Sequence, residues 1–182
     1  MIYIVSGFMR SGTSMMMESL EAGGMDCVKS ERRRMVNEHH RDGVYTPNPN
    51  DLYEPDFRRW GLTEARKHDG RLIKVVAPNI DILCVHDYKV VYLLRDTLEI
   101  QQSFYAAFGK EHPIKSIDES IKESLAVLRN RRDVQLITMN YTDVLDDPKK
   151  CLSRLDWPFD IDKAVQIVDP KHYRFQADRL VA

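Results

Sequence analysis

Hydrophobic positions along this chain fall into short apolar runs separated by longer stretches with helical spacing. The short runs are rich in β-branched and aromatic residues and end at glycine, proline or a charged side chain, so we expect buried strands there. These strands are expected over residues 2–6, 72–77, 89–94 and 133–139. Helices are expected over residues 13–22, 97–108, 117–129, 142–155 (with a break at Pro148) and 161–168, and a short one within 56–67.

Strands that alternate with helices favour a parallel sheet with right-handed crossovers and helices on both faces. The expected fold is therefore a three-layer α/β/α domain with a central parallel sheet, spanning residues 1–182 as one unit. In such sheets ligands bind beyond the carboxyl ends of the strands. Four residues with useful chemistry or geometry come directly after these ends, namely Arg10, Pro78, Arg95 and Tyr141.

Residues 28–70 form the least regular part of the pattern. Residues 41–51 contain two prolines and two asparagines among other turn formers, which makes a long strand or helix there unfavourable. A long irregular segment inside a domain of this size is usually functional or mobile. We therefore expect residues 36–60 to supply much of any substrate pocket.

The first strand leads into a glycine loop, Gly7-Phe8-Met9-Arg10-Ser11-Gly12-Thr13-Ser14. Strand, loop and helix N-terminus together favour anions, because the first helical amides have no intrahelical partner and the helix dipole is positive there. The spacing is that of a Walker A loop with Thr13 in place of the lysine. The glycine loop thus resembles a phosphate-binding P-loop, and the missing lysine argues against an ordinary ATPase or kinase. The alternative is a plain strand-to-helix turn with an incidental arginine.

Composition limits the partners and the cell compartment that we expect for the protein. The 27 basic and 28 acidic residues nearly cancel, so no global field favours nucleic acid or a membrane surface. Arginine clusters at 32–34 and 129–132 are interpreted as solvated faces, with phosphate binding as the alternative. Three scattered cysteines and the lack of a signal peptide or a long apolar span indicate a soluble cytoplasmic protein. The pattern does not specify an oligomeric state.

A second candidate anion site comes after the strand at 89–94. Arg95 stands at the strand end and Ser103 lies eight residues later, in the second turn of the next helix. A cation and a hydroxyl placed in this way can share one phosphate. The alternative is that Arg95 and Asp96 form a surface ion pair beside a helix cap, worth at most about 1 kcal/mol. Asp96 and Glu99 have the spacing of a capping box.

With both sites present, the chain resembles the sulfotransferases that use 3′-phosphoadenosine 5′-phosphosulfate (PAPS). Their 5′-phosphosulfate loop is similar to Arg10-Ser11-Gly12-Thr13-Ser14, and their 3′-phosphate motif is similar to Arg95 with Ser103. A later family segment resembles residues 141–148, whose first residue, Tyr141, is implied to lie near the nucleotide. Residues 48–54 and 168–174 are similar to elements of small bacterial members.

The resemblance implies a P-loop nucleoside triphosphate hydrolase-like fold and a sulfuryl transfer from PAPS, which leaves 3′,5′-adenosine diphosphate. The acceptor would be a hydroxyl or amine on a small or carbohydrate-like molecule. No metal is implied, since charge stabilisation and a proton acceptor suffice for such a transfer.

The catalytic base is the open point of this resemblance. Cytosolic animal members carry a histidine where this chain has Val76. By analogy with Golgi-type relatives, the candidates are Glu54 and Glu38, the latter preceding two histidines in what can also be a solvated turn. Lys74 is expected to assist at the leaving oxygen together with Arg10, or else to be a strand residue at the sheet edge.

Two other functions stay open on the sequence alone. One is a small P-loop kinase, against which the missing lysine and the lack of an evident acidic Walker B strand end argue. The other is a nucleotide-binding protein without a competent base, an interpretation that Val76 keeps open.

Overall fold

Four parallel strands make up the sheet in the computed structural model, which describes residues 1–28 and 61–169. The strand order is β2-β1-β3-β4, so the first strand lies inside the sheet and the second at its edge. The strands are β1 (Ile2–Gly7), β2 (Leu72–Val76), β3 (Tyr88–Leu94) and β4 (Val134–Asn140). All four were predicted, to within about two residues at each end.

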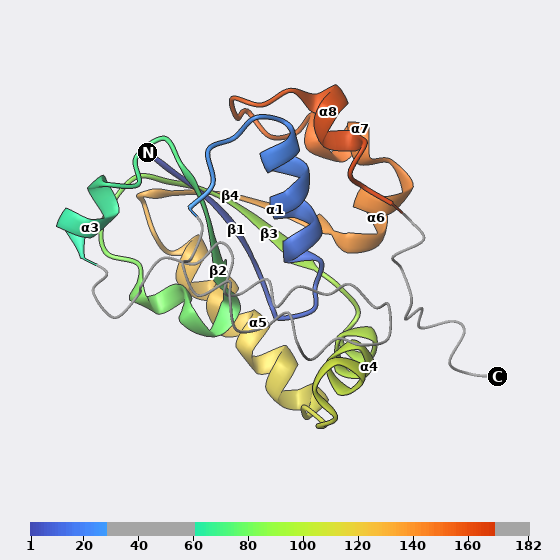
Figure 1. The fold of residues 1–182 in the computed structure, drawn as a ribbon. Helices are drawn as coiled ribbons and strands as arrows, with labels where there is room; N and C mark the ends of the chain where they lie inside the picture. The colour runs from blue at the N-terminus through green and yellow to red at the C-terminus, as the bar shows by residue number, and fades with distance from the viewer. Residues whose placement is uncertain (29–60, 170–182) are drawn as a thin grey trace.

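Helices connect the strands and cover both faces of the sheet (Figure 1). The described helices are α1 (Thr13–Ala22), α3 (Leu62–Arg66), η3 (Ala77–Ile82, a 3₁₀ helix), α4 (Thr97–Phe108), α5 (Ile114–Arg129), α6 (Tyr141–Asp146), α7 (Pro148–Leu152) and α8 (Ile161–Val165). The predicted three-layer α/β/α class is confirmed. Alternation along β1 shows how the layers arise, because successive strand residues point to opposite faces. Ile4 packs in the core under α5, and Val5 packs in the core under α1.

The structure corrects several predicted boundaries. Helix α5 begins at Ile114, three residues before the predicted start, directly after Pro113 as its N-cap. The predicted break at Pro148 is confirmed, since α6 ends at Asp146 and Pro148 opens α7. The 3₁₀ helix η3 was not predicted. Proline is tolerated in its first turn, where an amide donor is not needed, so Pro78 ends β2 and permits a helical turn at once.

An ion pair stabilises the amino-terminal end of the sheet, opposite the glycine loop. Arg131 donates from Nε and Nη2 to the Asp133 carboxylate at 3.0 and 2.6 Å, and Asp133 also accepts from the His86 amide. Hydrogen bonds from Arg131 lower the pKa of Asp133 from 3.8 to about 2. The lowered pKa means that the carboxylate stabilises the fold fully above pH 4, and that this stabilisation is lost as the pH falls toward 2.

We expect Asp133→Asn to lower the free energy of unfolding by about 2 kcal/mol at pH 7. The difference from the parent should shrink between pH 4 and pH 2, as the parent carboxylate takes up its proton. Urea unfolding at several pH values measures this difference. If the difference in the free energy of unfolding stayed constant between pH 4 and pH 2, the ion pair would not be the cause of the destabilisation.

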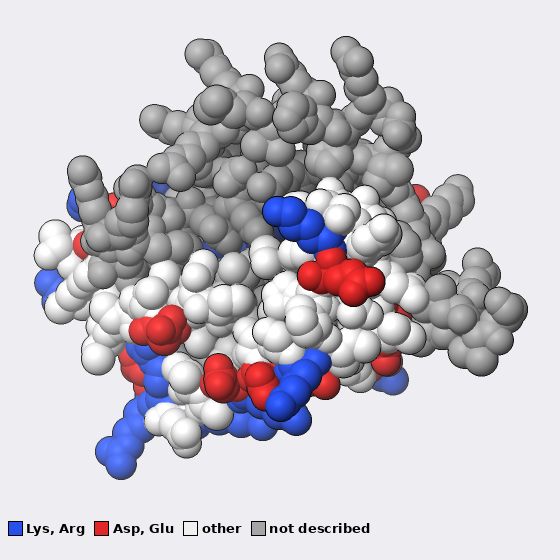
Figure 2. Space-filling model, turned by 90° about the horizontal axis from the view of Figure 1, so that it is seen from below, with Lys and Arg blue, Asp and Glu red and all other residues white. Residues whose placement is uncertain are grey.

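The described surface carries charge of both signs. Figure 2, seen from below the view of Figure 1, shows Lys and Arg lying among Asp and Glu rather than gathered into a single basic patch. Within residues 1–28 and 61–169, no helix is both long enough and apolar enough to cross a bilayer.

Candidate anion-binding site

The glycine loop turns sharply between β1 and α1. Three of its residues have positive φ: Gly7 at 146°, Arg10 at 71° and Gly12 at 93°. Arg10 is the only residue other than glycine with positive φ in the described part of the chain. A side chain in this left-handed region costs about 1–2 kcal/mol, so neighbouring contacts must hold Arg10 there.

Both glycines of the loop are required by close neighbours as well as by φ. A Cβ on Gly7 would lie 2.4 Å from Ser11 Oγ and 2.7 Å from the Leu93 carbonyl oxygen. A Cβ on Gly12 would lie 2.3 Å from a ring carbon of Tyr141. Glycine at both positions therefore lets the loop pack closely against Leu93 and Tyr141 in a backbone conformation that other residues adopt only with strain.

The interior of the loop fits an anion. Ser11 is fully buried, and its Oγ has no hydrogen-bond partner among the residues that the structure describes. Helix α1 begins directly after Gly12, which has no side chain to cap the first amides. Buried polar groups without partners are rare, and uncapped first-turn amides attract negative charge. Thr13 is buried and Ser14 partly buried in this first turn.

The two arginine sites predicted from the sequence contact each other. Strands β1 and β3 are paired, with Gly7 opposite Leu93, so their carboxyl ends lie side by side. Arg95 Nη1 donates to the carbonyl oxygen of Arg10 at 3.0 Å. Arg10 Nε in turn donates to Ser103 Oγ at 3.0 Å, and Ser103 is buried on α4. Arg10 thus links the loop to the helix that carries the second site.

Tyr141 joins the same cluster from the end of β4. The Arg95 guanidinium carbon lies 4.7 Å from the centroid of the Tyr141 ring, a distance at which cation and ring attract each other. The same ring blocks the space above Gly12. Three of the four residues predicted at strand ends, Arg10, Arg95 and Tyr141, are therefore brought together.

One participant was not recognised as such from the sequence. Glu99 was expected only to take part in a helix cap, yet its side chain lies against the guanidinium of Arg95, with Oε2 2.8 Å from Nε. Both side chains are buried, at 4% and 7% exposed. Arg95 precedes the Asp96 cap and so lies outside α4, which means that helical spacing does not relate it to Glu99. The short separation of four residues was the only signal in the sequence. The Asp96 cap itself is confirmed, with bonds from the amides of Leu98 and Glu99.

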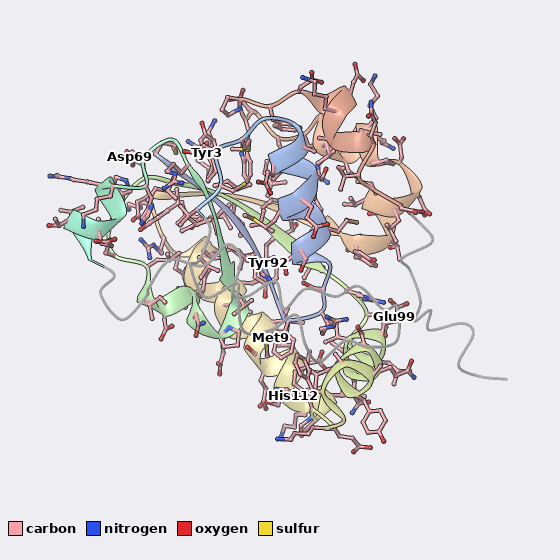
Figure 3. All side chains as sticks on the ribbon, viewed as in Figure 1. Tyr3, Met9, Asp69, Tyr92, Glu99 and His112 are labelled. Carbon is pink, nitrogen blue, oxygen red and sulfur yellow. The ribbon has the colours of Figure 1, made fainter. Side chains whose placement is uncertain are left out.

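Figure 3 shows how the labelled side chains divide between the two ends of the sheet. Met9 and Glu99 lie at the carboxyl end with the loop and α4, whereas Asp69 lies at the opposite end. His112 is also on the loop side, where its ring packs edge-on against Phe8 and Phe104 at centroid distances of 5.3 Å. The His112 ring thus packs behind the glycine loop.

Lys74 and Val76 occupy the last half of the edge strand β2. Lys74 is fully buried, with its Cα opposite Val5 of β1, and Val76 is 5% exposed. Lys74 does lie in the edge strand of the described sheet, and its full burial is unusual for a lysine. Its expected part at the leaving oxygen stays a prediction. Glu38 and Glu54, the predicted bases, lie outside the described residues, as do the whole of the segment 48–54 and most of 168–174.

The described ranges offer no evident metal centre. Within them, no group of three or more His, Cys, Asp or Glu side chains is placed to hold a metal ion. The prediction that no metal takes part stays a prediction.

Known proteins resemble this chain in fold rather than in sequence. No protein-family model matches the sequence, and no curated protein matches it significantly. The sulfotransferase domain of the olefin synthase from Synechococcus PCC 7002 superposes with a TM-score of 0.51 at 17% identity, covering 100% of this chain and 82% of that one. This likeness shows a shared α/β fold.

Two further solved structures have lower scores. A sugar kinase from Janibacter sp. HTCC2649 gives a TM-score of 0.47 at 16% identity, covering 92% of this chain and 98% of that one. Retinol dehydratase in complex with retinol and PAP gives 0.45 at 19% identity, covering 95% and 64%. The likeness to the first of these structures, the sulfotransferase domain, therefore extends to its α/β fold and no further.

Proposed function

We propose that this protein is a sulfotransferase that moves a sulfuryl group from PAPS to a hydroxyl or amine of a small or carbohydrate-like acceptor. One observation carries the proposal: two arginines stand at neighbouring strand ends and are joined by the Arg10–Ser103 and Arg95–Arg10 hydrogen bonds. PAPS has two separate anionic ends, the 5′-phosphosulfate and the 3′-phosphate. A ligand of this kind matches two linked cationic sites better than a single phosphate does.

Each group of residues has a separate task in this proposal. The loop from Arg10 to Ser14 holds the 5′ end, with backbone amides of α1 and the buried Ser11 hydroxyl directed at oxygen atoms. Arg95 and Ser103 hold the 3′-phosphate, and Tyr141 supports the Arg95 guanidinium from one side. Preorganised donors of this kind stabilise charge without reorganising during the reaction.

PAPS would supply an activated sulfuryl group, and residues of this chain would manage charge and protons around it. Arg10 and Lys74 are proposed to stabilise negative charge on the leaving oxygen. Glu54 or Glu38 is proposed to accept the proton of the attacking hydroxyl or amine. Val76 is buried and cannot take a proton, so the base must come from another element than β2.

The loop itself argues against a kinase. A Walker A lysine reaches the β- and γ-phosphates of a nucleoside triphosphate, and Thr13 is too short for that contact and is buried in α1. The arginine of this loop stands three positions earlier and points to Ser103 on α4. The cation is therefore directed toward the second anion site instead of along a triphosphate chain.

The proposal is tested by incubating the protein with ³⁵S-labelled PAPS and a panel of phenols, amines and oligosaccharides. We expect label to appear on at least one acceptor class, and Lys74→Met to lower turnover at least a hundredfold while changing nucleotide affinity less than tenfold. Tight binding of 3′,5′-adenosine diphosphate with no transfer across the panel would favour a binding protein. Magnesium-dependent turnover of ATP without PAPS activity would favour a kinase.

A further inference from the structure

A buried carboxylate beside a proposed phosphate site needs an explanation. The Glu99 side chain is 4% exposed and lies against Arg95, the residue assigned to the 3′-phosphate. A negative charge this close repels an anionic ligand and offsets much of the field of Arg95, more strongly in a buried site than in water. Electrostatics alone therefore makes a carboxylate at this position unfavourable for binding an anion.

The geometry of the pair supplies a reason. Arg95 comes directly after β3, and Glu99 lies four residues later in α4, whose start is fixed by the Asp96 cap. The carboxylate holds the guanidinium at Nε, and the Tyr141 ring lies against it. A planar group that is held at one edge and on one face has a fixed plane. Glu99 thus determines the direction in which the Nη atoms of Arg95 point.

That direction matters for the glycine loop. Arg95 Nη1 donates to the carbonyl oxygen of Arg10, the residue with positive φ in the loop. The bond holds a backbone conformation that costs free energy by itself. The Arg10 side chain then donates to Ser103, also on α4. Hydrogen bonds therefore link Glu99 to Arg95, Arg95 to the backbone of Arg10, and the Arg10 side chain to Ser103. Ser103 lies on α4, the helix that also carries Glu99.

We propose that Glu99 is a positioning residue of this site: it orients Arg95 and, through Arg95, keeps the glycine loop in its binding conformation. The inference rests on the proposed function. Glu99 acts through its acceptor oxygen and the length of its side chain. Its negative charge weakens anion binding, and the site binds the ligand in spite of it. Two rival roles differ in their consequences: a pure charge role that weakens anion binding, and a purely structural role in the fold.

Three substitutions separate these roles. Glu99→Gln keeps the length and an oxygen acceptor but removes the charge, Glu99→Asp keeps the charge but shortens the reach, and Glu99→Ala removes both. The probe is 3′,5′-adenosine diphosphate, measured by calorimetry. We expect Glu99→Gln to bind within threefold of the parent or more tightly. Glu99→Asp and Glu99→Ala should bind at least tenfold more weakly.

A pure charge role predicts instead that Glu99→Ala binds more tightly and Glu99→Asp like the parent, and either result would overturn the proposal. Asp133→Asn is the matched control, because it alters a similar arginine–carboxylate pair at the opposite end of the sheet. It should lower stability and leave nucleotide affinity unchanged. If the affinities of all the variants simply tracked their thermal stability, Glu99 would have only a structural role.

A second measurement needs no ligand and so separates this inference from the proposed function. ¹⁵N relaxation of the amides of residues 10–12 reports loop motion in the free protein. We expect added motion in Glu99→Asp and Glu99→Ala, and parent-like values in Glu99→Gln. A parent protein that fails to bind the nucleotide would refute the proposed function, whereas equal loop order in all four proteins would refute the role of Glu99.

Discussion

Replacing Arg95 with alanine should weaken binding of 3′,5′-adenosine diphosphate by about 10- to 150-fold, because a charge-assisted hydrogen bond contributes roughly 1.5–3 kcal/mol. The substitution also leaves the Glu99 carboxylate buried without its guanidinium. Removing one partner of such a pair lowers stability by about 3–5 kcal/mol. Calorimetry and urea unfolding on the same preparation measure both effects.

Two further variants separate the binding role of Arg95 from its structural role. Arg10→Ala removes the other cation and leaves the buried Arg95–Glu99 pair intact, so it should weaken binding with little loss of stability. Arg129→Ala removes an exposed arginine at the end of α5 and should change neither quantity. If Arg95→Ala and Arg10→Ala both bind the nucleotide as well as the parent does, the site assignment is wrong.

Gly12→Ala should damage the fold and the site together. Its Cβ would lie 2.3 Å from the Tyr141 ring, and its φ of 93° is unfavourable for alanine. Backbone strain of about 1–2 kcal/mol and overpacking of about 1–3 kcal/mol predict a total destabilisation of about 2–5 kcal/mol. The displaced ring also loses its place against Arg95, so nucleotide affinity should fall at least tenfold.

Gly24→Ala is the matched control for this substitution. Gly24 has a φ of 99°, close to that of Gly12, but a Cβ there would meet no described atom within 4 Å. It should therefore show the backbone strain alone, with unchanged nucleotide binding. Equal destabilisation by the two substitutions would mean that the Tyr141 ring moves aside without cost and does not define the loop.

Periodicity predicted most of the described fold because the strands are buried and their apolar runs are short. The 3₁₀ helix after β2 was missed, since Pro78 marks the end of a strand but does not specify the conformation of the residues after it. The early start of α5 was missed for a related reason: Lys115 and Ser116 lie on its polar face and add nothing to the apolar pattern.

The candidate site was predicted unevenly. The pattern put Arg10, Arg95 and Tyr141 after strand ends, which neighbouring parallel strands bring together, and the family resemblance then singled these residues out together with Ser103. Spacing could not show that Arg10 bonds to Ser103 instead of remaining within its own loop. It also could not show that Glu99 faces inward, since an acidic residue in a first helical turn is ordinarily explained by the helix dipole.

The central claim is that two linked anion sites bind the two ends of one nucleotide. It is tested most directly by calorimetric titration of the parent protein with 3′,5′-adenosine diphosphate, 5′-AMP and ATP with magnesium. We predict one binding site for the diphosphate and at least 30-fold weaker binding of 5′-AMP, which lacks the 3′-phosphate. Equal affinity for 5′-AMP, or tighter binding of magnesium ATP, would contradict the claim.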